Sequence, residues 1–178
     1  MLLTPLPPLA SDQLVTAAIP VDLRSDTYKL LYRVVTGPLS PGDRLDISAD
    51  ARVTNDVGVP GGTRYTIGVG SHLWAYSYTD PARSSGPWWR ISHLMGDNVD
   101  PTRHHMPLHI SCVYTVPDDW PPGHRMVICL RADAHSTAWA KNGGDDTLTV
   151  DTGYGQLVVR PWVNTPAPVE PTPCEPAA

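Results

Sequence analysis

One stretch of this chain alternates between apolar and polar residues without a break. Within the stretch 43–56, apolar side chains occupy every second position from residue 45 to residue 53, and polar ones stand between them. Successive side chains of a strand point to opposite faces of its sheet, so this pattern predicts a strand with one buried and one solvated face. The apolar residues of the stretch are Leu45, Ile47, Ala49, Ala51 and Val53.

Comparable extended segments recur along the chain, and no helical pattern interrupts them. Twenty prolines and fourteen glycines lie mostly between these segments, as in proteins with many short strands and turns. The chain is therefore predicted to be all-β, an antiparallel β-sandwich or jelly roll of about eight or nine strands. Besides the alternating stretch, the expected strands are 14–23, 28–35, 64–78, 88–94, 106–116, 125–134, 146–151 and 156–163.

Proline content divides the chain into three parts. Residues 1–13 form an apolar, proline-interrupted N-terminal arm that cannot be helical, because proline fixes the backbone and lacks a donor. Residues 14–163 form the β-sandwich domain. Residues 164–178 carry proline at nearly every second or third position and predict an extended polyproline-type tail, roughly 45 Å long at 3.1 Å per residue.

Charge and hydropathy argue against two classes of partner. The net charge is −5 and the arginines are scattered along the chain, so a nucleic-acid-binding role is not expected. No apolar run approaches the ~18 residues that span a bilayer, and the N-terminus has no secretory signal pattern. We expect a protein that is made in a cytoplasm, where it stays soluble or is assembled into a larger structure, and that has no membrane partner.

The three cysteines do not predict a disulfide framework. Cys112 and Cys129 lie within apolar strands, where small buried thiols are common. A bridge between them stays open, because it depends on whether their strands are neighbours. Cys174 in the proline-rich tail is expected to be a spare thiol rather than a ligand.

A histidine cluster, His104, His105 and His109, is a candidate metal site. His105 and His109 share a face of an extended strand but stand about 13 Å apart at ~3.3 Å per residue, too far for one ion. Pro101 and Pro107 exclude a helix that would bring them together. One histidine from each of three chains could still converge on a three-fold axis. We favour a loop or interface role for His104 and His105, with no metal and no cofactor.

Nucleophilic catalysis finds little support in the sequence. Gly70-Ser71-His72 is not the Gly-x-Ser-x-Gly turn of a serine hydrolase, and no phosphate-binding loop occurs. We therefore expect a protein that is not an enzyme. Trp88 and Trp89 follow a long polar stretch and form a possible ligand or interface surface, although tryptophans in apolar strands are more often buried.

Three segments together resemble a known group of proteins. They are 43–55 with Tyr65–Gly70, Asp100–His105, and the stretch from Gly143 to Val159. They resemble jelly-roll domains of actinobacteriophage virion structural proteins, which are related in shape to the trimers of tumour necrosis factor and C1q. The resemblance covers about residues 28–162. It does not account for the insertion at 79–90 or for the proline-rich ends.

The resemblance implies a capsid decoration, minor capsid or tail protein on the surface of a phage particle, made in the host cytoplasm. It implies a homo-oligomer, a trimer above all, that contacts the major capsid protein or other virion proteins. An apolar arm suits such contacts, because it adds strands to neighbouring subunits. The residues expected to dock are Leu2, Leu3, Leu6 and Leu9. The alternative is a tail or fibre module that binds a host surface glycan through Trp88 and Trp89.

Overall fold

The computed structural model describes the greater part of the chain as strands. The described residues are 2–11, 18–22, 28–55, 67–78, 89–99, 105–135, 147–151 and 153–165. The described residues contain no helix, and therefore no helix long and apolar enough to cross a membrane. The strands are β1 (Leu2–Pro5), β2 (Leu9–Ser11), β3 (Ala18–Asp22), β4 (Lys29–Leu39), β5 (Arg44–Thr54), β6 (Ile67–Tyr78), β7 (Trp89–Val99), β8 (His105–Thr115), β9 (His124–His135), β10 (Thr147–Val150) and β11 (Gln156–Thr165).

The strands pair as one long hairpin rolled onto itself. β6 pairs with β7, β5 with β8, β4 with β9, β3 with β10 and β2 with β11, always antiparallel. Each strand in the first half of the chain thus pairs with its counterpart in the second half. Such nested pairing, with connections that pass from one sheet to the other, is the topology of a jelly roll.

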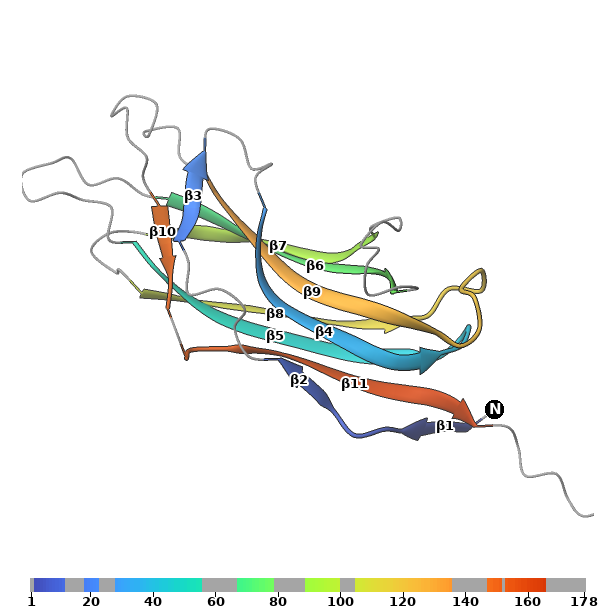
Figure 1. The fold of residues 1–178 in the computed structure, drawn as a ribbon. Coiled ribbons are helices and arrows are strands. Elements are labelled where there is room, and N and C mark those ends of the chain that lie inside the picture. The colour runs from blue at the N-terminus through green and yellow to red at the C-terminus, as the bar shows by residue number, and fades with distance from the viewer. Residues whose placement is uncertain are drawn as a thin grey trace, which may run out of the picture.

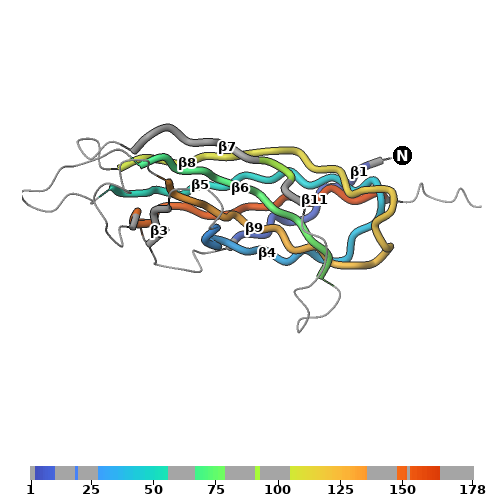
Figure 2. Tube along the Cα trace, turned by 90° about the horizontal axis from the view of Figure 1, so that it is seen from above, coloured from blue at the N-terminus to red at the C-terminus, as the bar shows by residue number. Residues whose placement is uncertain are grey.

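Two sheets result from this pairing (Figure 1). Sheet A has the order β2–β11–β5–β8, with β1 continuing along β11 beyond β2 and β10 pairing with the end of β5. Sheet B has the order β4–β9–β6–β7, which Figure 2 shows across the molecule. β3 pairs antiparallel with β10 and parallel with the end of β9, so it joins the two sheets at one end.

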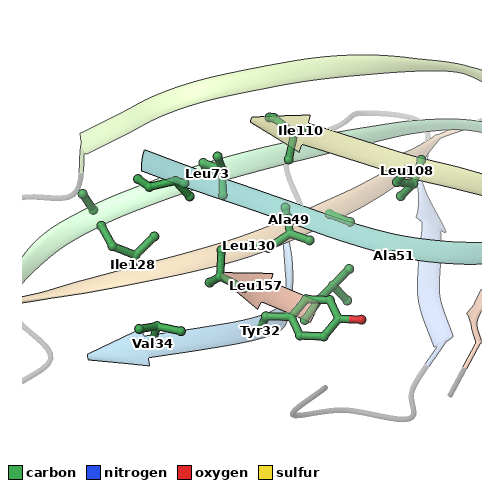
Figure 3. Packing of buried hydrophobic residues seen from close by; sticks show 14 of the residues in the cluster. Tyr32, Val34, Ala49, Ala51, Leu73, Leu108, Ile110, Ile128, Leu130 and Leu157 are labelled. Carbon is green, nitrogen blue, oxygen red and sulfur yellow. The ribbon is translucent and has the colours of Figure 1, made fainter. Parts of the chain in front are cut away.

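The core lies between the two sheets. The five alternating apolar residues of β5 are all buried, each with 3% or less of its surface exposed, and the side chains between them are more exposed. Leu73 of β6 and Leu130 of β9 meet them from sheet B (Figure 3). Facing sheets pack about 10 Å apart, a distance that interdigitating side chains of this size fill.

The two ends of the sandwich differ in what they carry. The turn between β4 and β5, the turn between β8 and β9, Leu2 and Thr165 all lie at one end, which we call the terminal pole. At the opposite end, the far pole, Thr54 pairs with His105, and Gly68 pairs with His135. Figure 1 shows the N-terminus beside the end of β11 at the terminal pole.

The prediction of an all-β jelly roll is confirmed. The described residues form eleven strands, against the eight or nine expected, and the additional two are β1 and β2 in the N-terminal arm. Turns occur at Pro41–Gly42 and at Pro122–Gly123, as the proline and glycine positions indicated. Residues 142–146, whose glycines and aspartates also indicate a turn, lie outside the described residues. The division into arm, domain and tail at residues 13 and 163 stays a prediction.

Candidate functional site

The N-terminal arm lies along the free edge of sheet A. Leu2 pairs with Thr165 and Pro5 with Trp162, and the pairing resumes at Leu9 opposite Val159. Between the two strands, the Leu6 amide donates to the Pro161 carbonyl at 2.8 Å. An arm held in this way is a strand addition, which uses backbone hydrogen bonds and places few demands on the side chains.

The four leucines expected to dock have different surroundings. Leu9 is half-buried and packs against the main core, and Leu3 is half-buried as well. Leu6 is 41% exposed, one of the most exposed large apolar side chains among the described residues. Leu2 is placed in β1, where only its backbone pairing is described. Leu6 is therefore the arm residue best placed to contact a neighbour.

A buried carboxylate fixes the terminal pole. Asp43, 3% exposed, accepts hydrogen bonds from the Ser40 amide at 2.8 Å and from the Asn164 amide at 2.7 Å. The Asn164 side chain in turn donates to the Pro41 carbonyl. Hydrogen bonds to a charged acceptor are stronger than neutral ones. The end of β11, from which the proline-rich tail begins, is thus held against the β4–β5 turn.

Two of the other predicted site residues lie outside the described residues, namely Trp88 and His104. Trp89 is in β7 opposite Ala75, where only its backbone pairing is described. A ligand surface formed by Trp88 and Trp89 stays a prediction. His105 is exposed and belongs to a polar network at the far pole.

The polar network of the far pole joins β5, β8 and the residue after β10. The Thr54 hydroxyl donates to the Asp151 carboxylate, whose Oδ1 lies 2.8 Å away, and it lies 2.6 Å from His105 Nδ1. Arg52 pairs with the same carboxylate, and its guanidinium stacks 3.2 Å above the centre of the Tyr154 ring.

This network has the residue types of a nucleophile–histidine–carboxylate triad but not the geometry. In such a triad, the nucleophile and the carboxylate contact opposite nitrogens of the imidazole. Here Thr54 Oγ1 and Asp151 Oδ2, 3.4 Å away, both face Nδ1 of His105, and the Thr54 proton is directed to Asp151. The arrangement ties strands together and does not activate the hydroxyl.

The histidines His105 and His109 lie on the exposed face of β8, as the strand prediction required. His109 Nδ1 lies 2.6 Å from Asp50 Oδ1, and both side chains are more than half exposed. Each histidine therefore has its own carboxylate neighbour. The described ranges contain no group of three potential metal ligands.

A third His–Asp pair lies on the outer face of sheet B, and the sequence reasoning missed it. His72 Nε2 is 3.0 Å from Asp133 Oδ1, and the two side chains are 3% and 1% exposed. The ring of Tyr28 packs edge-on against His72, with ring centres 4.8 Å apart. The pair is assembled by the register of β6 and β9, which sets Gly70 opposite Asp133.

Two glycines make room for this pair. A Cβ atom on Gly70 would overlap Asp133 Oδ1 and His72 Nε2, and a Cβ atom on Gly68 would overlap the His135 ring. The side chains of Asp133 and His135 of β9 therefore lie across β6 at the two glycines. The pairing of β6 with β7 also shifts register here, between Gly68 and Val69.

Aromatic and arginine side chains gather beside the pair. On the outer face of sheet B, Trp74, Tyr76 and Tyr78 alternate along β6 toward the terminal pole, above Val127 and Cys129 of β9. Arg33 and Arg125 lie 5.7 Å and 5.6 Å from the centre of the Tyr78 ring, and Arg131 lies 5.8 Å from that of Trp74. We call this the aromatic–arginine surface, formed by Trp74, Tyr76, Tyr78, Arg33, Arg125 and Arg131.

The aromatic–arginine surface could not be read from residue spacing alone. Its arginines are scattered in the sequence, at positions 33, 125 and 131, and the pairing of β4 with β9 brings them together beside the aromatic residues of β6. Arg33 and Arg125 are exposed, and Trp74 and Tyr78 are half-buried, while Tyr76 is buried. The long stems of Arg33 and Arg125 allow their charged ends to stay in solvent, whereas Arg131 is half-buried and its Nε atom is enclosed by protein.

The two described cysteines are free and cannot pair with each other. Cys112 packs against the main core between the sheets, whereas Cys129 belongs to the apolar cluster on the outside of sheet B. Sheet B itself separates them. Burial raises the pKa of the Cys129 thiol to about 11, although nearby Arg131 and Arg33 partly offset this rise. Burial also raises the pKa of Cys112.

A shallow depression lies on the outer face of sheet A. It has a volume of about 230 Å³ and is lined mainly by Asp46, Ser48, Ser111, Val113 and Arg160. Pockets that hold small-molecule ligands usually measure ~300–1,000 Å³ and are more enclosed. This depression has neither the size nor the depth of such a pocket.

Comparisons with known proteins give no further guide to function. A scan against protein-family models found no match, and a search of curated proteins found none either.

Proposed function

We propose that this protein is a non-enzymatic structural subunit of a bacteriophage particle, a capsid decoration or minor capsid protein that assembles as a trimer. The observation that carries the proposal is the position of the N-terminal arm. β1 and β2 lie along the edge of sheet A, β1 reaches the pole from which the tail begins, and Leu6 between the two strands stays exposed.

A protein attached to a surface through one pole holds its opposite pole in a fixed orientation. Both chain ends of the described structure meet at the terminal pole, where Asp43 holds Asn164 against the β4–β5 turn. An exposed apolar residue on an edge-strand arm is suited to contact a partner, because burying its surface on binding is favourable. The resemblance to phage jelly-roll proteins supports the same role.

Incorporation into particles tests the proposal. We expect Leu6→Asp to leave the fold intact, since the side chain is exposed, and to reduce the copy number in purified particles at least tenfold. Val113→Asp is the matched control, because Val113 is 58% exposed and lies on β8, at the opposite edge of sheet A from the arm. Equal incorporation of the Leu6→Asp variant and the wild type would refute docking by the arm.

Native mass measurement tests the assembly state separately. A trimer has three times the chain mass of 19.3 kDa. A single-chain mass at every concentration, together with absence from particles, would overturn the proposed function as a whole.

A further inference from the structure

We propose that residues 166–178, the proline-rich segment after β11, dock on the aromatic–arginine surface of their own chain. This inference does not depend on the virion role. It starts from a contrast in charge: the protein has a net charge of −5, yet this surface carries three arginines. The acidic residue nearest to them on β9, Asp133, is already paired with His72.

The tail has the complementary charge. Residues 166–178 contain Glu170 and Glu175 and no lysine or arginine. The two glutamates would stand about 15 Å apart in a polyproline-type segment that rises 3.1 Å per residue. The cationic positions, at Tyr78 and at Trp74, are four residues apart along β6, or about 13 Å at 3.3 Å per residue.

The tail also has the chemistry that an aromatic surface binds. Five of its thirteen residues are prolines, at 166, 168, 171, 173 and 176. Proline-rich segments dock on grooves lined by aromatic rings, because their extended conformation is already formed and little entropy is lost. Half-buried Trp74 and Tyr78 offer such rings, and the arginines beside them can bind carboxylates.

The starting point of the tail lies within reach of this surface. The Asn164 side chain contacts the Pro41 carbonyl, and Arg125 Nε donates at 2.9 Å to the Thr36 carbonyl of β4. Pro41 and Thr36 are five residues apart, about 16 Å along an extended chain. Residues 166–170 span a similar length. Glu170 would therefore arrive beside Arg33 and Arg125, and Glu175 beside Arg131.

A nitroxide attached to Cys174 in the full chain reports whether the tail is held. Cys174 is the thiol to label, because burial raises the pKa values of Cys112 and Cys129. We expect an immobilised electron paramagnetic resonance spectrum for the wild type. The double variant Arg33→Glu with Arg125→Glu should convert most of the signal to the mobile form, as should 1 M salt, which screens exposed charges.

The controls separate docking from general effects of charge. Arg44→Glu with Arg160→Glu changes two arginines of sheet A and should leave the spectrum immobilised. Adding Glu170→Arg to the Arg33→Glu, Arg125→Glu variant should restore immobilisation. A label that is mobile in the wild type, or equally immobilised in the sheet B variant, would overturn the proposal. Binding of oligothymidylate with a mobile tail would overturn it too and would assign the surface to single-stranded nucleic acid.

Discussion

Two of the His–Asp pairs among the described residues are alike in composition and differ in their surroundings. His72 and Asp133 lie on the outer face of sheet B, almost wholly buried, at 3.0 Å. His109 and Asp50 lie on the outer face of sheet A, more than half exposed, at 2.6 Å. The shorter distance belongs to the exposed pair, yet the buried pair should matter far more for stability. Burial, rather than distance, decides what such a pair contributes, because water competes with the exposed partners.

The largest effect should come from filling the space that the buried pair occupies. Gly70→Val places a side chain where Asp133 and His72 meet, so the pair must separate inside a packed face. We expect the free energy of unfolding to fall by about 4 kcal/mol or more in urea denaturation. Gly37→Val is the control, because nothing lies within 4 Å of a Cβ atom there. Similar losses for both variants would show that the pair is not the cause.

The next largest effect on stability should follow from changing the buried carboxyl group alone. Asp133→Asn keeps the shape of the side chain but replaces one partner of the pair, and breaking a buried pair in this way costs about 3 kcal/mol or more. The double variant His72→Leu, Asp133→Leu should recover much of that loss, since apolar replacements of both partners need no compensation. Thermal and urea unfolding of the three proteins test this. If the Asp133→Asn variant were as stable as the wild type, the buried pair would not contribute more to stability than the exposed pair.

The sequence predicted those features that depend on one strand alone, and it did not predict those that depend on which strands pair. The face of β5 was fully predicted, because the alternation from Leu45 to Val53 lies within a single strand. His105 and His109 were placed on one face of β8 for the same reason.

The outer face of sheet B could not be predicted in this way. His72 and Asp133 are 61 positions apart, and they meet only through the register of β6 and β9. The spacing Gly68-x-Gly70-x-His72 was a usable signal, since two glycines on one strand face leave room for partners. It did not identify those partners, because a shift of one residue in register would have turned Asp133 to the other face.

A third prediction concerns how stability changes at alkaline pH. It depends on Cys129, which lies on the outer face of sheet B. The Cys129 thiol has a pKa of about 11 in the folded protein, above the ordinary value of 9.0 that it regains on unfolding. The unfolded state therefore loses this proton first. The stability from Cys129 is fully present below pH 9 and declines by roughly 2 kcal/mol as the pH rises to 11.

Denaturation of the wild type and of Cys129→Ala between pH 8 and 11 measures this contribution. Other groups that titrate in this range affect both proteins, so the difference between the two curves isolates Cys129. If the stability of the wild type and of Cys129→Ala changed with pH in the same way, the Cys129 thiol would not be shielded from water. This result would also weaken the contrast between the two outer faces.

A smaller effect is expected at the far pole, where Thr54 is buried but its partners are partly exposed. Thr54→Val removes the hydroxyl that lies between His105 and Asp151 while nearly keeping the volume of the side chain. Loss of such a hydrogen bond costs about 1–2 kcal/mol. Ser111→Ala, on the exposed face of β8, should change stability by less than about 0.5 kcal/mol. Equal effects of these two substitutions would show that the network adds nothing to strand pairing.

The smallest effect should come from the exposed pair itself. A double-mutant cycle with His109→Ala and Asp50→Ala isolates their interaction, because each single variant also changes the local β-propensity. We expect a coupling energy of about 0.5 kcal/mol or less at low salt, and less again in 1 M salt, which shortens the screening length to about 3 Å. The same cycle on His72 and Asp133 should give several times that value. A coupling for His109 and Asp50 as large as for the buried pair would mean that distance governs both pairs, and the distinction between the two faces would then fail.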